Sequence, residues 1–364
     1  MSELKVDKVS PRTGTYVSLN TVGMKNILIN GDMSINQRGT SVSGLSSSTT
    51  YNTTDRWQFQ LDQAGTYTQS VSTDVPTGQG FVKSLKVDCT TSVTPSASGY
   101  ALIAQQIEGQ NLQYIKKGTA NAESLTVSFW VKSNKTGTYI TNLVDNDNSR
   151  RIAKSYTINS ADTWEKKTIT FAGDTTGAFD NDNLSSMQLY FWLASGSNYT
   201  SGTLATSWES TNLANIAVGQ VNLADSTSNE WLITGVQLEA GTTASDFEFL
   251  PVDVNLARCQ RYFQSLNGAN ATALGDGITQ TSTTSRIYVS FINPMRSSPT
   301  ATFSTLAITD SVNYGPAVTS IDAIASGTTS ARLSLTHSSG ASALRAAMLI
   351  LNSASGYLHL SSEL

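Results

Sequence analysis

Histidine, the side chain most often used in acid–base catalysis, is scarce in this 364-residue sequence. The two histidines are His337 and His359, and neither accompanies a serine or cysteine in a recognisable nucleophile motif. His359 alternates outward in "YLHL", and His337 stands where a strand is expected to end. The sequence also contains no glycine-rich phosphate-binding motif. We therefore expect surface or packing roles for both histidines.

Carboxylates could still act in pairs, because glycoside hydrolysis needs only two of them. The candidates for such a pair are Glu108, Glu209, Glu239 and Asp246. The chain has 27 acidic residues, so the presence of two candidates is no evidence for an acid pair. We expect a protein that is not an enzyme and that needs no cofactor.

Oxygen ligands for calcium are a second chemical candidate. Four aspartates lie in Asn-rich loops, namely Asp145, Asp147, Asp180 and Asp182. The EF-hand spacing is absent because no glutamate stands at the twelfth position, and turn formation accounts for Asp and Asn equally well. Whether calcium is bound stays open at this point.

Aromatic rings could form a platform on which sugar rings stack. The candidate glycan contacts are Trp57, Trp192, Tyr199 and Trp208. Trp130 and Trp192 stand opposite the apolar stripes of their strands, so we expect them outside the core. Large aromatic residues are also common in subunit interfaces, and we assign Trp130 to such an interface.

The composition favours an all-β protein. Hydrophobic residues make up 39% and charged residues only 14%, and Ser, Thr, Asn and Gly replace the missing charge. The net charge of -4 and the pI of about 5.2 give no basis for nucleic-acid binding. No apolar run approaches the ~18 residues of a membrane span. Cys89 and Cys259 are far apart and indicate neither a zinc site nor a disulfide framework.

Period-two alternation predicts many short strands between residues 25 and 250, which we assign to a jelly-roll β-sandwich. The apolar faces of two such strands are Leu125, Val127, Phe129 and Val131, and Met187, Leu189, Phe191 and Leu193. Near residue 235, Val236 and Leu238 are expected opposite Trp231 and Ile233. The first strand pair is expected in "NILINGDMSINQ", as a hairpin with an Asn-Gly turn.

Three further regions complete the predicted organisation. Residues 1–24 resemble an arm that cannot bury a core of its own. Residues 251–264 contain a short linking helix, for which Asp253 is the expected N-cap. Residues 265–364 alternate like a small C-terminal β-sandwich. The apolar stripe of the helix region includes Leu256, Cys259 and Phe263.

Several ordered motifs resemble segments of bacteriophage tail-fibre-like virion proteins. The opening "KNILINGDMSINQRGTS" is followed by "DRW" at residues 55–57. Further along the chain come "SFWVKS", "WEKKTITFAGD" and "WLITGVQLEAGTTASDFEF", then "ARCQRYFQ", "FINPMRSSPTATF" and the terminal "GYLHLSSEL". The first module is similar to the jelly rolls of carbohydrate-binding modules, which concerns fold and not function.

The resemblance implies a homotrimeric, non-enzymatic structural protein that is made in the host cytoplasm and becomes part of the virion. A tail fibre or receptor-binding protein would contact host-surface glycan, and residues 1–24 would join it to other virion proteins. A head fibre or capsid decoration protein, anchored by the same arm, is the alternative. A glycan depolymerase is the third hypothesis.

The resemblance also sets expectations for single residues. In a trimer, we expect Leu256, Cys259 and Phe263 to lie near the threefold axis. We expect Arg38, Asp55 and Arg56 to tie down a loop of the first module. Because Asp55 and Arg56 are adjacent and point apart, each should pair with some other residue.

Overall fold

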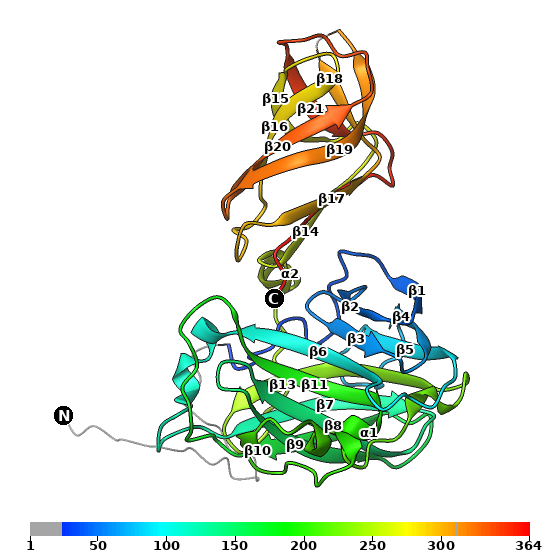
Figure 1. The fold of residues 1–364 in the computed structure, drawn as a ribbon, viewed down its shortest axis with the longest axis vertical. Helices are drawn as coiled ribbons and strands as arrows, with labels where there is room; N and C mark the ends of the chain where they lie inside the picture. The colour runs from blue at the N-terminus through cyan, green and yellow to red at the C-terminus, as the bar shows by residue number, and fades with distance from the viewer. Residues whose placement is uncertain (1–23, 311) are drawn as a thin grey trace, which may run out of the picture.

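The computed structural model describes residues 24–310 and 312–364, and most of its regular elements are β-strands (Figure 1). The predicted all-β fold is confirmed. Apart from Met24, the predicted N-terminal arm lies outside the described residues. No helix in the described part of the chain is long and apolar enough to cross a membrane. Figure 1 shows a broad sandwich, with a narrower body formed by the last third of the chain above it.

Two antiparallel sheets form the sandwich. The order of the first sheet is β1 (Ser41–Leu45), β4 (Thr66–Ser72), β5 (Ser84–Thr91), β13 (Glu230–Ala240), β7 (Leu125–Ser133) and β10 (Glu165–Phe171). The order of the second sheet is β12 (Glu209–Ser210), β9 (Arg150–Ile158), β8 (Gly137–Asp145), β11 (Ser185–Ser195), β6 (Tyr100–Glu108), β3 (Gln58–Asp62) and β2 (Ser48–Tyr51). Short helical turns lie in the connections: η1 (Gly109–Asn111), η2 (Gln113–Ile115), α1 (Ser197–Thr200), η3 (Leu213–Asn215) and η4 (Leu223–Asp225).

The sandwich core is filled by the residues that the alternation predicted. Strands β7 and β11 contribute Leu125, Val127, Phe129, Val131, Met187, Leu189, Phe191 and Leu193 to one buried cluster. None of these side chains is more than 4% exposed. Burial of alternate residues from two facing sheets therefore accounts for this part of the fold.

Strand β13 departs from simple alternation. The sequence pattern placed Val236 and Leu238 opposite Trp231 and Ile233, but all four lie in the same core cluster. A β-bulge beside Gly235, which has a φ of +61°, shifts the register between β13 and β7. The extra residue reverses which positions face the core, so this part of the prediction was wrong.

The opening Asn-Gly stretch forms turns and bends instead of the predicted hairpin. Asn30 has a φ of +57°, and its side-chain amide donates to the carbonyl oxygens of Ile35 and Asp55, each at 2.9 Å. Gly31 is required for a different reason: a Cβ at this position would lie 2.0 Å from a carbonyl oxygen of β13. The Asn-Gly pair therefore anchors the chain against β13 and Asp55.

Helix α2 (Val252–Gln260) follows the sandwich. Pro251 is its N-cap residue, and Asp253 lies in the first turn and not at the predicted cap position. A three-stranded sheet of β14 (Phe263–Asn267), β22 (Tyr357–Ser361) and β17 (Thr300–Ser304) comes next in space. Figure 1 shows this sheet between α2 and the narrower body.

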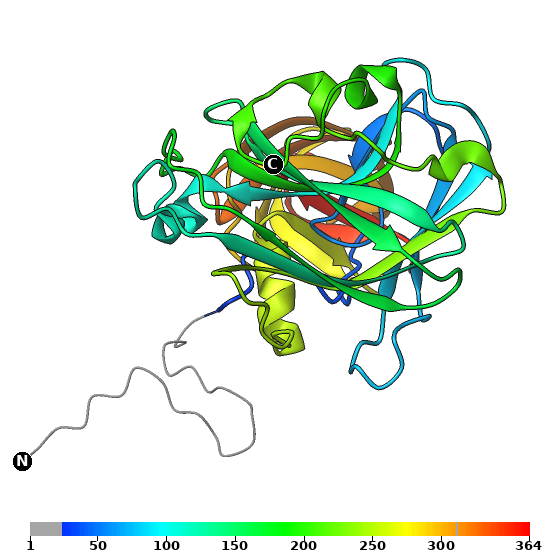
Figure 2. The same cartoon turned by 90° about the horizontal axis from the view of Figure 1, so that it is seen from below.

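The remaining strands close into a barrel, a more specific arrangement than the small sandwich that the alternation suggested. The order around the barrel is β15 (Ala273–Thr279), β16 (Thr284–Ser290), β20 (Ser330–His337), β19 (Tyr314–Ser326), β18 (Leu306–Asp310) and β21 (Ala346–Leu351). Figure 2, turned by 90°, looks along the molecule from the sandwich side. Two irregularities in the pairing of β19 with β20 bend the sheet.

Glycines in β15 permit its close approach to β16. A Cβ on Gly275 would lie 2.2 Å from the carbonyl oxygen of Tyr288, and one on Gly277 would lie 1.9 Å from that of Arg286. Glycine in a strand interior often marks such an approach or a barrel bend. Barrel closure thus depends on glycines, whose role cannot be recognised from the hydrophobic alternation of the sequence.

Replacing Gly277 by Ala should lower the free energy of unfolding by about 1–3 kcal/mol, because the new methyl group meets backbone that cannot move aside. Denaturant unfolding measures this change. Gly327→Ala is the matched control, since a Cβ there meets nothing within 4 Å, and its effect should stay within about 0.5 kcal/mol. Equal effects of the two substitutions would contradict this account of barrel closure.

Candidate functional site

Two of the four predicted glycan contacts lie inside the protein. Trp57 is 0% exposed, and its indole N–H donates to the carbonyl oxygen of Asn30 at 2.9 Å. Trp192 is 2% exposed, and its indole N–H donates to the side chain of Asn142. Neither ring offers a free face to a sugar in this structure.

The other two candidates, Tyr199 and Trp208, are partly buried and belong to the chain segment that follows β11. The ring centroid of Tyr199 lies 5.5 Å from that of Trp192 and 6.0 Å from that of Tyr100. The indole of Trp208 donates to the carbonyl oxygen of Ala172 at 2.7 Å. The segment therefore covers Trp192, and this face of the second sheet is packed with the chain's own side chains.

The residues assigned to a trimer interface also have partners within the chain. Cys259 is 0% exposed and Phe263 is 4% exposed. Leu256 is partly buried against the small cluster that contains Cys259 and Tyr262. Trp130 remains partly exposed on the outer face of β7. Burial of Cys259 and Phe263 by their own chain leaves them no free surface for a neighbouring subunit in this structure.

The candidate acids are held by neighbouring polar groups. Glu239 accepts hydrogen bonds from the backbone N–H and the hydroxyl of Ser245, each at 2.8 Å. Glu209 accepts one from the amide of Asn215 at 2.9 Å. Glu108 is paired with Arg261, as described below. These contacts give three of the four candidate acids structural partners.

The loop aspartates stabilise turns. Asp147 accepts a hydrogen bond from the backbone N–H of Asp180 at 2.9 Å, and Asp182 accepts one from that of Leu184 at 2.9 Å. Asp145 is fully buried and pairs with Lys117 at 2.5 Å. Within residues 24–310 and 312–364, no group of three or more His, Cys, Asp or Glu side chains is placed to hold a metal ion.

A network of buried charges joins the sandwich to the C-terminal part. Arg56 is fully buried, pairs with Glu363 and donates to the carbonyl oxygen of Gln106 at 2.8 Å. Its guanidinium carbon lies 3.5 Å from the ring centroid of Tyr262. Burial alone would lower the pKa of Arg56, but the charge of Glu363, together with the interactions with Tyr262, Tyr51 and Cys259, outweighs burial and the pKa is raised.

Arg38 forms the second arm of the network. It pairs with Glu363 at 2.8 Å and with Asp55 at 3.5 Å, and it lies 3.6 Å from the ring centroid of Phe263. Burial raises the pKa of Asp55 to about 6, against the opposing effect of Arg38. The expectation that Asp55 and Arg56 each pair with some other residue is confirmed, because Asp55 pairs with Arg38 and Arg56 pairs with Glu363. The two arginines bind the C-terminal segment through Glu363, in addition to any loop of the first module.

Two more arginines, Arg261 and Arg296, connect the sandwich to the C-terminal part of the chain. We call their contacts, together with those of Arg38, Arg56 and Glu363, the junction. Arg261 donates to both oxygens of Glu108, at 2.8 and 2.7 Å, and the Tyr262 hydroxyl also donates to Glu108. Burial raises the pKa of Glu108, but these bonds outweigh it and the pKa is lowered. Arg296 donates to the carbonyl oxygens of Asn183 and Glu363, each at 2.9 Å. Each of these arginines bonds to residues of a different part of the chain.

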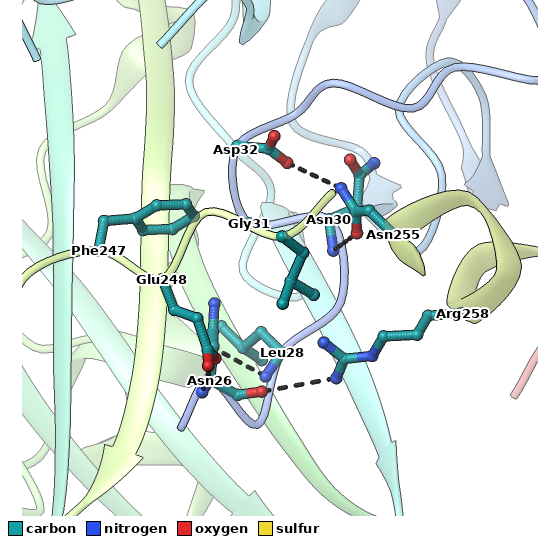
Figure 3. A pocket seen from close by; sticks show the side chains of 10 residues that line it. Asn26, Leu28, Asn30, Gly31, Asp32, Phe247, Glu248, Asn255 and Arg258 are labelled. Atoms are coloured by element: carbon teal, nitrogen blue, oxygen red, sulfur yellow. Dashed lines mark hydrogen bonds between the residues drawn. The ribbon is translucent and has the colours of Figure 1, made fainter. Parts of the chain in front are cut away.

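The opening stretch is also bound to α2, as Figure 3 shows. Asn255 donates to the carboxylate of Asp32 at 3.1 Å and accepts from the backbone N–H of Asn30 at 3.2 Å. Arg258 of the same helix donates to the carbonyl oxygen of Asn26 at 3.5 Å. A cavity of about 10 Å³ remains between these residues, which is room for one water molecule.

Two larger hollows open beside the junction. A groove of about 490 Å³ is lined by the first described residues, β6, η1, η2 and α2, and Arg258 and Arg261 both reach it. A second groove, of about 410 Å³, lies beside Arg38. There the ring of His359 stacks on Tyr357 at 3.8 Å, and burial, with a contribution from Arg38, lowers the pKa of His359 to about 4.

Sequence reasoning identified some of these residues and missed others. It named Arg38, Asp55 and Arg56. It missed Glu363 as their common partner, because the two arginines and the glutamate are more than 300 residues apart. The only available signal was the lone acid within the terminal motif "GYLHLSSEL".

No family model matches this chain, and no curated protein matches it. Among solved structures, it is similar to the enzymatically active domain of tailspike protein 4 of bacteriophage CBA120, at 14% identity over 59% of this chain, with a TM-score of 0.31. The match spans 21% of that tailspike chain.

Carbohydrate-binding modules are also among the similar structures. One is TmCBM61 in complex with β-1,4-galactotriose, at 12% identity over 60% of this chain and 99% of that chain, with a TM-score of 0.29. Another is the family 11 module of the cellulase Lic26A-Cel5E of Clostridium thermocellum, at 15% identity over 56% of this chain and 98% of that chain, with a TM-score of 0.27.

The junction network generates a direct prediction. Arg56→Met should lower the free energy of unfolding by about 3 kcal/mol or more, because Glu363 would remain buried with only part of its compensating charge. Arg286→Met, on the exposed outer face of β16, should change it by less than about 0.5 kcal/mol. Chemical denaturation of both variants makes the comparison, and a loss no larger for Arg56 than for Arg286 would contradict the role given to the network.

Proposed function

We propose that this chain is a non-enzymatic structural protein of a phage virion, a tail fibre or receptor-binding protein that contacts host-surface glycan. The proposal rests on the ordered sequence resemblance, together with one structural observation. Four of the motifs that carry the resemblance, at residues 25–41, 55–57, 257–264 and 356–364, contribute to the buried junction. A junction of this kind suits a protein that must hold one module at a fixed position relative to another.

The far end of the barrel is the proposed host-facing end. Strand registers place three loop segments together there, namely residues 280–283, 312–313 and 338–345. The opposite end carries the 291–299 loop, whose Arg296 contacts the junction. Residues 313–316 also lie at this far end, whereas most of residues 268–277 form strand β15 and the turn before it.

These loops are held in place by their own hydrogen bonds. Asp310 accepts from the backbone N–H groups of Val312, Asn313 and Ser342, at 2.8, 2.7 and 2.7 Å. The carbonyl oxygen of Thr279 accepts a hydrogen bond from the backbone N–H of Leu344 at 2.8 Å. Val312, Tyr314 and Leu344 are nevertheless 65, 64 and 77% exposed. Rigid loops with exposed apolar and aromatic side chains are suited to binding.

The virion location, the homotrimer and attachment through residues 1–24 belong to the same proposal. The head-fibre alternative needs the same scaffold and differs in what the arm binds, so imaging of labelled particles separates the two. The glycan depolymerase hypothesis has less support, because Glu108, Glu209 and Glu239 accept hydrogen bonds from neighbouring polar groups of the chain.

A homotrimer should have three times the 38.8 kDa mass of the chain in light scattering. Trp130→Ser should then give monomers if the outer face of β7 is the interface, because this partly exposed ring would lose its contacts in the neighbouring subunit. Tyr288→Ser, at a 61% exposed position on the barrel, is the control and should leave the mass unchanged. A monomeric wild-type chain would contradict the trimer.

Combined substitution of Tyr314 by Ala and Leu344 by Ser should reduce adsorption of particles to their host about tenfold or more, through the loss of central contacts. The melting temperature should be unchanged, since both side chains are mostly exposed. Ile292→Ser, at a 58% exposed position on the opposite end of the barrel, is the control. Undiminished adsorption would overturn the assignment of this end to the receptor.

A further inference from the structure

The 490 Å³ groove beside α2 contains an arginine, Arg258, that forms no ion pair with any described residue. Among the described residues, the only hydrogen bond of Arg258 is the 3.5 Å contact to the carbonyl oxygen of Asn26, and no carboxylate lies within ion-pair distance of it. Glu248 lines the neighbouring small cavity together with Arg258, and its charge favours the charged form of Arg258. Its carboxylate, however, accepts the backbone N–H groups of Lys25 and Asn26, each at 2.9 Å. Among the described residues, Arg258 therefore has no ion-pair partner.

The neighbouring Arg261 lines the same groove but has a carboxylate partner for its charge. Its guanidinium is bound to both oxygens of Glu108. Burial lowers the pKa of Arg258, whereas the bonds to Glu108 raise that of Arg261. A partly buried charge without a partner costs folding free energy, so an anion bound beside Arg258 would be stabilised there.

The walls of the groove combine apolar and polar groups. Ile27, Ile29 and Ile107 provide apolar lining. Tyr114 is 51% exposed, so one part of its ring is accessible at the groove. The amide of Asn111 has no hydrogen-bond partner within the described part of the chain. The groove thus presents an aromatic ring, apolar side chains, a neutral amide and one guanidinium that forms no ion pair with a described residue.

We propose that this groove binds a carboxylated sugar, with Arg258 pairing with its carboxylate and Tyr114 packing against its ring. The volume lies within the 300–1,000 Å³ range of small-molecule sites, which suits one or two sugar rings better than an extended peptide. A guanidinium recognises carboxylate with fixed geometry. This site is separate from the far-end loops of the barrel, and the proposal does not depend on a virion location.

The test is a titration of the full-length protein with glucuronic acid and with N-acetylneuraminic acid, followed by saturation-transfer NMR and calorimetry. Glucose and the methyl ester of glucuronic acid are the neutral probes, and acetate is the carboxylate without a sugar ring. At least one acidic sugar should bind about tenfold or more tightly than the neutral probes and than acetate. Arg258→Gln and Tyr114→Ala should each abolish that preference.

Arg286→Gln is the matched control, because it removes an arginine charge from the barrel surface, and binding should be unchanged. Unaltered melting temperatures of Arg258→Gln and Tyr114→Ala exclude misfolding, and the half-exposed position of Tyr114 makes the second variant safe in this respect. Equal binding of neutral and acidic sugars, binding of acetate as tight as that of the sugars, or no sugar binding would each overturn the proposal. Preferential binding of a polyglutamate peptide would also overturn it, in favour of a protein partner.

Discussion

The relative placement of the two bodies depends on the burial of one carboxylate, that of Glu363, between Arg38 and Arg56. Both arginines come from the first module, and the glutamate comes from the end of the described chain. None of the three can be withdrawn without leaving a charge in a region from which water is largely excluded. The rings of Phe263 and Tyr262 cover the two guanidinium groups and bring the linking segment into the same unit.

A buried ion pair is poor evidence for net stability, since desolvation can cancel the attraction between its members. In this protein, the buried ion pairs fix the relative positions of the groups that they join. Apolar side chains can slide past one another at little cost, but the paired guanidinium and carboxylate groups are satisfied in only one arrangement. Arg261 with Glu108 and Arg296 with Asn183 repeat this constraint at two other points of the junction. Several directional contacts around one interface prevent rotation of the barrel relative to the sandwich.

The sequence predicted the parts of the structure that local pattern controls. Alternation in β7 and β11 identified their buried faces, because a sheet face has a strict period of two. It could not identify the bulge at Gly235, which needs a positive φ, or the closure of the barrel, which needs close backbone approaches at Gly275 and Gly277. The Asn30–Gly31 pair suggested a hairpin, but the Asn30 side chain bonds to Ile35 and Asp55 and Gly31 packs against the backbone of β13. Burial of Trp57 and Trp192 also escaped prediction, because alternation within a strand does not show which segments cover its faces.

The junction also explains why one arginine stands out. Arg38, Arg56 and Arg261 lie within one region of the molecule, and each is matched there by a carboxylate. Folding gives each of these three guanidinium groups a carboxylate partner. Among the described residues, Arg258 of α2 has only a 3.5 Å bond to a carbonyl oxygen, and this difference is the basis for assigning it to ligand binding. An arginine with a structural role is stabilised by a carboxylate of the same chain. An arginine that binds a ligand must instead leave its guanidinium accessible to the ligand's anion. Arg258 meets the second condition and faces a groove large enough for that ligand.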